Sequence, residues 1–276
     1  MRASPPAKRL SSPLPADSLY HQRDAVQRLL HPLLDLATQS DYLVAGSAGE
    51  FAIGRQVFQV PRFIFLGPTG GGETIRLGIF AGFHGDEPEG TEALITFLKE
   101  LEMEPQLARG YHIYVYPLCN PTGFVARAHG NAAGADLTSQ FWSGSSQSEV
   151  YYLERELGVL RFQGVISLHS EKSTGNFTVN TSNIVLNPAL VPPAIRATQQ
   201  YLPGRTANAE IELPRSSSTP PSDFLTATNE LSPVPFELHI GIPTAAPKPS
   251  QIHGTLAALK SVLDTYRSLL AIRQNL

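Results

Sequence analysis

The stretch Phe80-Ala-Gly-Phe-His-Gly-Asp-Glu-Pro-Glu-Gly90 joins an apolar run to a helical one and therefore decides the fold. The run from Leu77 to Phe83 predicts a buried strand, and the segment from Pro88 to about Leu101 has the periodicity of an amphipathic helix. Proline is favoured at the first position of a helix, so the residues between these segments form a strand-to-helix turn. This order of elements is typical of α/β proteins.

His84 and Glu87 lie in this turn, at the carboxyl end of the predicted strand. Open α/β sheets place their ligand sites at this end. An imidazole and a carboxylate three residues apart are two of the ligands that a catalytic zinc needs. The alternative is structural, namely an acid that caps the helix beside a turn histidine. The rest of the chain has to decide between these interpretations.

The composition fits one large α/β domain. The 276 residues are 42% hydrophobic and 16% charged, which supplies a real core. A formal net charge of -3 without a basic run argues against nucleic acid or an anionic membrane as partner. A single cysteine, Cys119, rules out an internal disulfide. Since the sequence has neither a membrane-length apolar segment nor an apolar signal core at its start, we expect a cytoplasmic protein.

The pattern along the chain predicts an α/β fold in a single domain, with a mixed, mostly parallel central sheet and helices on both faces. Residues 1–16 are rich in Ser and Pro and are expected to form a flexible arm, and residues 17–276 form the domain. Helices are predicted at 17–37, 90–101, 149–160, around 193–201 and at 250–276. Strands are predicted at 51–60, 62–66, 74–83, 111–117, 164–169 and 234–240.

Two connecting segments have distinctive compositions. Residues 67–72, Gly-Pro-Thr-Gly-Gly-Gly, are interpreted as a hairpin turn. They lack the Gly-Lys-Ser/Thr ending of a phosphate loop, which argues against nucleotide binding there. Residues 213–235 are rich in Ser, Thr and Pro and are long for a loop in a compact domain, so they are a candidate lid.

A third metal ligand is expected from another strand end. The apolar run Val165 to Leu168 leads directly to His169. Together with His84 and Glu87, this residue makes a His₂Glu set, which leaves one zinc position open for water. Ligation by imidazole and oxygen without a thiolate suits a hydrolytic zinc. The alternative for His169 alone is a structural histidine at the end of a strand.

Two further residues are candidates for the chemistry of hydrolysis. In the strand 234–240, the period of two places Glu237 and His239 on the face opposite Phe236 and Leu238. Glu237 is therefore a candidate general base, or alternatively a surface acid on an edge strand. Arg127 follows a strand on a loop and could stabilise an oxyanion, although a surface cation is the alternative.

Five motifs in matching order resemble the zinc carboxypeptidases of the M14 type and the related succinylglutamate desuccinylase/aspartoacylase group. The resemblance covers about residues 75–240. The motifs are Ala81-Gly-Phe-His-Gly-Asp-Glu-Pro-Glu-Gly90, then Asn120-Pro121 with Gly123 and Arg127, then Gly134-Ala135-Asp136-Leu137, then Ser167-Leu168-His169-Ser170, then Phe236-Glu237.

The resemblance implies a zinc carboxypeptidase-like domain that holds one zinc ion per chain. It implies His84, Glu87 and His169 as the zinc ligands. It implies Glu237 as the general base and Arg127 as the group that polarises the scissile carbonyl. Asp136 would be the carboxylate that orients the ring of His84.

The sequence departs from the family at the substrate anchor. Family members follow Asp-Leu with an Asn-Arg pair that grips a terminal carboxylate, whereas this chain has Thr138-Ser139, which cannot form a bidentate charged clamp. There is also no tyrosine between Gly204 and Glu237 to match the family's mobile tyrosine. Candidate replacements for the anchor are Arg205, Arg215, Lys172 and His239.

We therefore predict a zinc-dependent metallohydrolase that cleaves an amide bond in a peptide or an N-acyl amino acid, with a Glu base and zinc-activated water. Two alternatives stay open. One is an N-acyl amino acid deacylase in the manner of the desuccinylase/aspartoacylase group. The other is a non-catalytic binding protein that retains zinc, which the loss of the Asn-Arg pair suggests. The oligomeric state is not predicted by the sequence.

Overall fold

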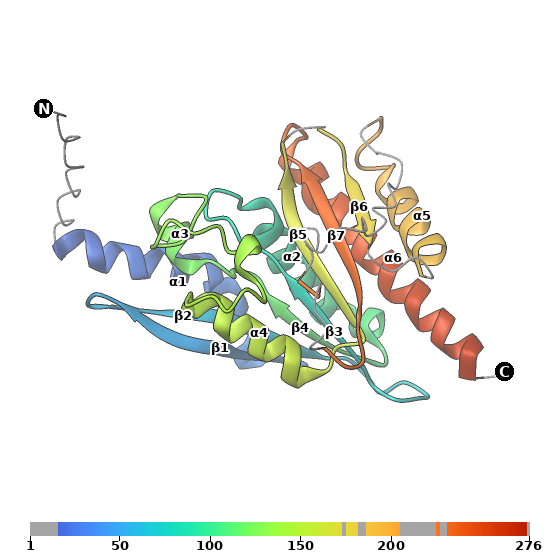
Figure 1. The fold of residues 1–276 in the computed structure, drawn as a ribbon. Helices are drawn as coiled ribbons and strands as arrows, with labels where there is room; N and C mark the ends of the chain where they lie inside the picture. The colour runs from blue at the N-terminus through green and yellow to red at the C-terminus, as the bar shows by residue number, and fades with distance from the viewer. Residues whose placement is uncertain (1–15, 173–174, 182–185, 205–224, 227–230, 275–276) are drawn as a thin grey trace, which may run out of the picture.

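The computed structural model describes residues 16–172, 175–181, 186–204, 225–226 and 231–274. Within them, seven strands form one mixed sheet in the order β1-β2-β4-β3-β5-β7-β6 (Figure 1). The four central strands β4, β3, β5 and β7 are parallel to their neighbours in that run. The strands are β1 Leu43–Ile53, β2 Gln56–Leu66, β3 Ile75–Phe80, β4 Tyr111–Tyr116, β5 Gly164–Glu171, β6 Thr178–Thr181 and β7 Phe236–Pro243.

Helices cover both faces of the sheet, so the predicted α/β fold class is confirmed (Figure 1). Helices α1, α2, α5 and α6 lie on one face and α4 on the other. The helices are α1 Ala16–Gln39, α2 Glu89–Met103, α3 Pro121–Ala126, α4 Ser148–Leu160, α5 Asn187–Thr198 and α6 Lys248–Gln274, with 3₁₀ turns η1 Pro105–Ala108 and η2 Thr138–Gln140. No helix among the described residues is long and apolar enough to cross a membrane.

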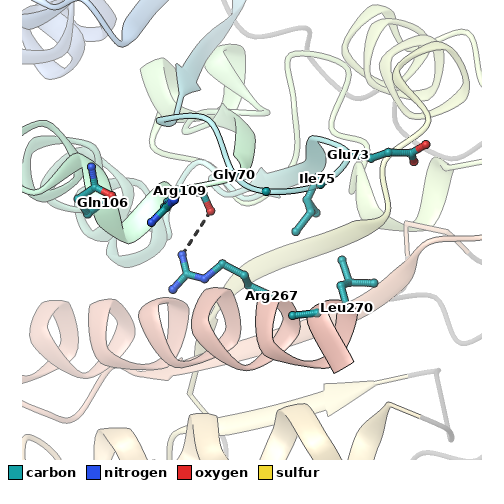
Figure 2. A pocket seen from close by; sticks show the side chains of 11 residues that line it. Gly70, Glu73, Ile75, Gln106, Arg109, Arg267 and Leu270 are labelled. Carbon is teal, nitrogen blue, oxygen red and sulfur yellow. Dashed lines mark hydrogen bonds between the residues drawn. The ribbon is translucent and has the colours of Figure 1, made fainter. Parts of the chain in front are cut away.

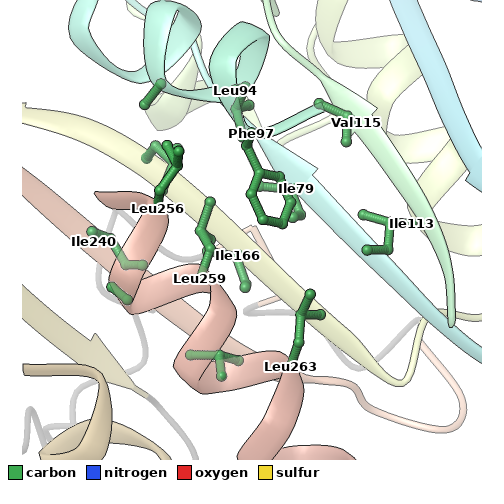
Figure 3. Close-up of a cluster of buried hydrophobic side chains, with 14 of the residues drawn as sticks. Ile79, Leu94, Phe97, Ile113, Val115, Ile166, Ile240, Leu256, Leu259 and Leu263 are labelled. Atoms are coloured by element: carbon green, nitrogen blue, oxygen red, sulfur yellow. The ribbon is translucent and has the colours of Figure 1, made fainter. Parts of the chain in front are cut away.

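Side chains alternate between two buried clusters because strand residues point to opposite faces in turn. On the first face, Ile79, Ile166 and Ile240 pack against the apolar sides of α2 and α6 (Figure 3). The opposite face forms what we call the second cluster. Its members are Ala48, Phe51, Val60, Phe80, Phe83, Tyr116, Cys119, Leu153, Leu157, Phe162, Val165, Leu225 and Leu231. The candidate site residues of β5 and β7 share this second face.

The pairing of the strands β1 to β4 differs from the prediction. The segment 67–72 is not a hairpin turn, because β2 and β3 do not pair with each other and both pair with β4. The hairpin instead joins β1 to β2 and turns at Gly54, which has a φ of +60°. The predicted strand 51–60 was wrong, because it crosses this turn and combines the end of β1, which begins at Leu43, with the start of β2. The short strand β6 was not predicted. A glycine run marks a connection, but it does not reveal which strands pair across it.

Some predictions fall on residues that the structure does not describe. These are most of the N-terminal arm (residues 1–15), the candidate anchors Arg205 and Arg215, and most of the candidate lid at 213–235. The domain boundary at residue 17 and the lid therefore stay predictions.

Candidate metal centre

The turn after β3 brings His84 and Glu87 side by side. His84 Nδ1 lies 3.1 Å from Glu87 Oε2. The turn packs against α3 at Gly85, where an added Cβ would lie 1.9 Å from the carbonyl carbon of Gly123. Only glycine permits this approach, so the sequence His-Gly-x-Glu fixes the turn locally. The helix N-cap is Pro88, one residue later than predicted, which leaves the Glu87 carboxylate free of a capping role in α2.

Asp136 holds the other side of the His84 ring, as the family resemblance implies. Asp136 Oδ1 lies 3.1 Å from His84 Nε2. The same oxygen accepts hydrogen bonds from the backbone N–H and the hydroxyl of Thr138, at 3.0 and 2.8 Å. With Nε2 directed at Asp136, Nδ1 is directed at Glu87, which is the arrangement typical of a metal-bound imidazole with a carboxylate behind it. Thr138 therefore orients Asp136 in this structure.

His84 and Glu87 shift each other's pKa values. Burial lowers the pKa of His84, but the hydrogen bonds and charges of Glu87 and Asp136 outweigh it and raise that pKa overall. Burial raises the pKa of Glu87, but His84 and Lys172 outweigh it, so the net shift is downward. The carboxylate is thus held in its charged form, which is the form that binds a metal ion.

His169 lies at the end of β5 with its ring stacked between two others. The ring centroids are 5.2 Å from Phe83 and 4.3 Å from His239. Its Nε2 atom is buried and has no hydrogen-bond partner among the described residues. Burial, with smaller effects of His239 and His84, places the pKa of His169 well below its ordinary value, so the ring is neutral and able to ligate. A buried unpaired polar atom is costly, which indicates that this nitrogen has a partner when the site is filled.

The three predicted ligands meet. His84, Glu87 and His169 each offer one ligand atom, and these atoms lie within 4.8 Å of one another. Two imidazoles and a carboxylate match the donor set of a catalytic zinc with an open position. The residues present therefore fit the implied metal.

Glu237 does not join this group. In the β5–β7 register, His169 lies beside Gly241 and Val165 lies beside Glu237. A shift of four residues corresponds to about 13 Å along a strand. The Glu237 side chain is fully buried, and its carboxylate accepts hydrogen bonds from Leu225 and Thr226. A general base must come within hydrogen-bond reach of the water that it activates, so this position does not fit the predicted role.

The other predicted residues have mixed placements. Arg127 is exposed at the end of α3, with a left-handed φ of 52°, and it is not among the groups that contact the three ligands. Ser139 is exposed and donates from its hydroxyl to the Asp136 carbonyl at 2.8 Å. His239 stacks on His169, with its Nδ1 3.5 Å from the Ser167 hydroxyl oxygen. His239 therefore contacts the ring of a predicted ligand.

A histidine and a lysine side chain lie over the predicted ligands. The His129 ring stacks on His84 with a centroid distance of 3.7 Å. Lys172 Nζ lies 3.1 Å from Glu87 Oε1 and 3.4 Å from Asp86 Oδ2. Asp86 Oδ1 is also 3.4 Å from His129 Nδ1. Lys172 was predicted only as one of four possible anchors, and His129 was not predicted, although it lies in the same loop as Arg127.

Glu171 is a second residue that the sequence analysis missed. It lies two residues after His169 on β5 and so points to the same face. Gly241 has no side chain there, and a Cβ added to it would lie 3.3 Å from Glu171 Cβ and 3.7 Å from Glu171 Oε2. The Glu171 carboxylate therefore lies over Gly241, at the level of His169. The period of two along β5 could have shown that these residues share a face.

A separate cavity of about 550 Å³ lies at the opposite end of the parallel strands (Figure 2). Ile75, which begins β3, and Gly110, which precedes β4, line it with Arg109 and Arg267. Arg267 donates to the Arg109 carbonyl oxygen at 3.3 Å. His84 follows the other end of β3, so this cavity is not part of the metal centre.

Comparison with solved structures decides the fold assignment. A candidate metallopeptidase from Shewanella amazonensis is 22% identical with a TM-score of 0.67, covering 87% of this chain and 92% of its own. A metallo-carboxypeptidase from Burkholderia cenocepacia is 14% identical with a TM-score of 0.70, covering 88% and 69%. Bovine thrombin-activatable fibrinolysis inhibitor is 12% identical with a TM-score of 0.65, covering 88% and 95%. The chain has the metallocarboxypeptidase fold.

This fold confirms the architecture that the sequence motifs implied. No family model matches the sequence, and no curated protein matches it. At identities of 12–22%, the comparison establishes the fold alone. Function has to be argued from the site.

Proposed function

We propose that this protein is a zinc-dependent metallohydrolase that cleaves an amide bond in a peptide or an N-acyl amino acid. The observation that carries the proposal is the meeting of His84, Glu87 and His169, with a buried His169 nitrogen that has no partner among the described residues. The metallocarboxypeptidase fold supports it.

Zinc bound by these ligands would supply a water of lowered pKa and would polarise the substrate carbonyl. The chain's own residues would hold the ligands in place for this chemistry. Asp136 fixes the tautomer and orientation of His84 through its Nε2 atom. Phe83 and His239 confine the ring of His169 from both faces.

We assign the role of general base to Glu171 in place of Glu237. Glu171 shares a face with His169 and lies over Gly241, whereas Glu237 lies four residues back along β7. The proton removed from the attacking water would go to a Glu171 carboxylate oxygen and then to the leaving amine. Lys172, one residue further along the chain, is the better placed of the two candidate anchors that the structure describes and would bind an acidic group of the substrate.

Metal content tests the ligand assignment. Purified protein reconstituted with zinc should hold about one ion per chain, and both His84→Ala and His169→Ala should lose most of it. His253→Ala on α6 is a matched control that should keep the metal. Full zinc content in both ligand variants would overturn the assignment.

A substrate panel separates the alternatives. The zinc-loaded protein is offered short peptides with free C-termini and N-acyl amino acids. Cleavage of N-acyl amino acids alone would favour the deacylase, and this alternative is supported by Thr138, which is engaged with Asp136 where the family has its anchor. Zinc binding without turnover of either class would favour the non-catalytic binding protein.

A further inference from the structure

We infer that Glu237 is a positioning residue, which ties the segment Leu225–Thr226 to β7 and thereby holds Trp142, the residue that follows Phe141 in the chain. This segment precedes β7 in the chain and lies against the second face of the sheet. The inference concerns the packing beneath the ligands and does not depend on the reaction proposed above.

The Glu237 carboxylate uses both of its oxygens. Oε1 accepts from the Leu225 backbone N–H at 2.6 Å, and Oε2 accepts from the Thr226 N–H at 2.8 Å and its hydroxyl at 2.5 Å. A fully buried carboxylate is tolerated only where such donors compensate for the lost water. Backbone N–H groups cannot reverse their polarity, so both positions require an acceptor. An amide in place of the carboxylate would set its NH₂ group against one of these N–H donors.

Leu225 is in turn hydrogen-bonded to Trp142. The Leu225 carbonyl accepts the Trp142 indole N–H at 2.7 Å. The Trp142 backbone N–H is held by the carboxylate of Glu154 on α4. Trp142 follows η2 closely, and Thr138 of η2 is the residue that orients Asp136. Glu237 is therefore linked through two hydrogen bonds, by way of Leu225, to Trp142, which follows the segment that supports His84.

A second connection runs through packing. Leu225 belongs to the second cluster together with Phe83. Phe83 stacks on the His169 ring and meets Phe141 edge-on at a centroid distance of 6.2 Å. Leu225 is thus packed in the same cluster as the ring that confines His169. Losing the Glu237 bonds should loosen both supports together.

The chain contains one tryptophan, so Trp142 fluorescence reports directly on this connection. In metal-free Glu237→Gln, the emission should shift to the red and acrylamide quenching should increase, because the Leu225 carbonyl no longer holds the indole. The zinc affinity of the variant should fall several-fold, as expected when support of a ligand is lost. Thr226→Val, which removes only the hydroxyl donor, should show a smaller change in the same direction.

Glu156→Gln is the matched control. Glu156 is also a buried carboxylate, but it accepts from the Tyr116 hydroxyl and Arg62 and is not bonded to Leu225 or Trp142. Its emission should match that of the wild type even if its stability falls.

Hydrogen exchange provides a readout that needs no variant. In the wild-type protein, the amides of Leu225 and Thr226 should exchange slowly, because both donate to a buried carboxylate. Fast exchange of both amides, or unchanged Trp142 emission and quenching in a folded Glu237→Gln variant, would overturn the inference. These readouts are made without metal, so a failure of the zinc site does not affect them.

Discussion

His169 on β5 and Glu237 on β7 point to the same face of neighbouring strands, yet they differ in what surrounds them. Both side chains are polar, and both were predicted from the sequence to act at the metal. The His169 Nε2 atom is buried without a partner among the described residues, whereas the Glu237 carboxylate accepts three hydrogen bonds. A buried polar atom that lacks a partner indicates a ligand, and one with full hydrogen bonding indicates a structural role. In our proposal, the same face of one sheet therefore carries both a metal ligand and a positioning residue.

The largest effect is expected from the test of which glutamate, Glu171 or Glu237, acts as the general base. Glu171→Gln should lower kcat about 10²–10⁴-fold, because it removes the proposed proton acceptor, while the zinc content stays unchanged. Glu237→Gln should lower kcat far less. Steady-state kinetics of zinc-loaded proteins on the best substrate of the panel provide the measurement. If Glu237→Gln abolished turnover while zinc content, fold and Trp142 emission stayed intact, Glu237 would be the base, as the family resemblance implies, and our assignment of Glu171 would be wrong.

The support of His84 should have the next largest effect. Asp136→Ala should weaken zinc binding about 10–100-fold, because the imidazole loses the carboxylate that fixes its Nε2 side. Competition with a metal chelator measures this directly. Ser139→Ala is the control, since the Ser139 hydroxyl bonds to the Asp136 backbone carbonyl and to the Gln140 side chain and leaves the Asp136 carboxylate untouched. Equal zinc affinity in wild type and Asp136→Ala would show that the contact is incidental.

Gly241 tests whether the space opposite His169 has to stay empty. Gly241→Ala would bring a Cβ within 2.4 Å of Thr178 Oγ1 and 3.3 Å of Glu171 Cβ. We expect a loss of about 1–3 kcal/mol in the free energy of unfolding and a reduced kcat, because Glu171 is displaced. Gly158→Ala in α4 has no neighbouring atom within 4 Å and should be neutral or stabilising. Denaturant unfolding compares the two variants.

The pH dependence of the free energy of unfolding should reveal the titration of the buried Glu237 carboxyl group. Burial raises the pKa of Glu237 from its ordinary value of 4.5 to about 7, against the hydrogen bonds from Thr226 and Leu225. The folded state then binds this proton more tightly than the unfolded state. Its contribution to stability is full below pH 4.5 and is lost as the pH rises through about 7.

This sign gives a prediction for the difference between two proteins. The wild-type free energy of unfolding, measured relative to Glu237→Gln, should fall as the pH rises from about 5 to about 8. The comparison with the variant cancels the titration of His84 and Asp136, which both proteins share. A difference that stays constant across this range would show that the Glu237 carboxylate does not titrate there.

Local signals in the sequence predicted three candidate metal ligands that lie close together in the structure. His84 and Glu87 belong to one turn, and His169 ends an apolar run, so each placement depended on neighbouring residues alone. The face of Glu237 was also predicted correctly, because it depends on the period of two along a strand. Its distance from His169 depends on the register between β5 and β7, which no local pattern specifies.

The remaining misses have the same origin. Glu171 lies over Gly241 only because two distant segments pair, and His129 reaches His84 only through the fold of its loop. The segment 67–72 was misassigned because its glycines reveal a turn but not the partner of each strand. Composition and periodicity predicted the layers of the fold, and tertiary pairing determined which polar groups meet.

Anomalous diffraction at the zinc absorption edge, from crystals of zinc-loaded protein, tests the central claim most directly. We predict a single strong peak among His84 Nδ1, a Glu87 oxygen and His169 Nε2, about 2.0–2.2 Å from each. A peak placed elsewhere, such as between Asp86 and His129, or a peak that leaves His169 Nε2 without a metal contact, would contradict the account.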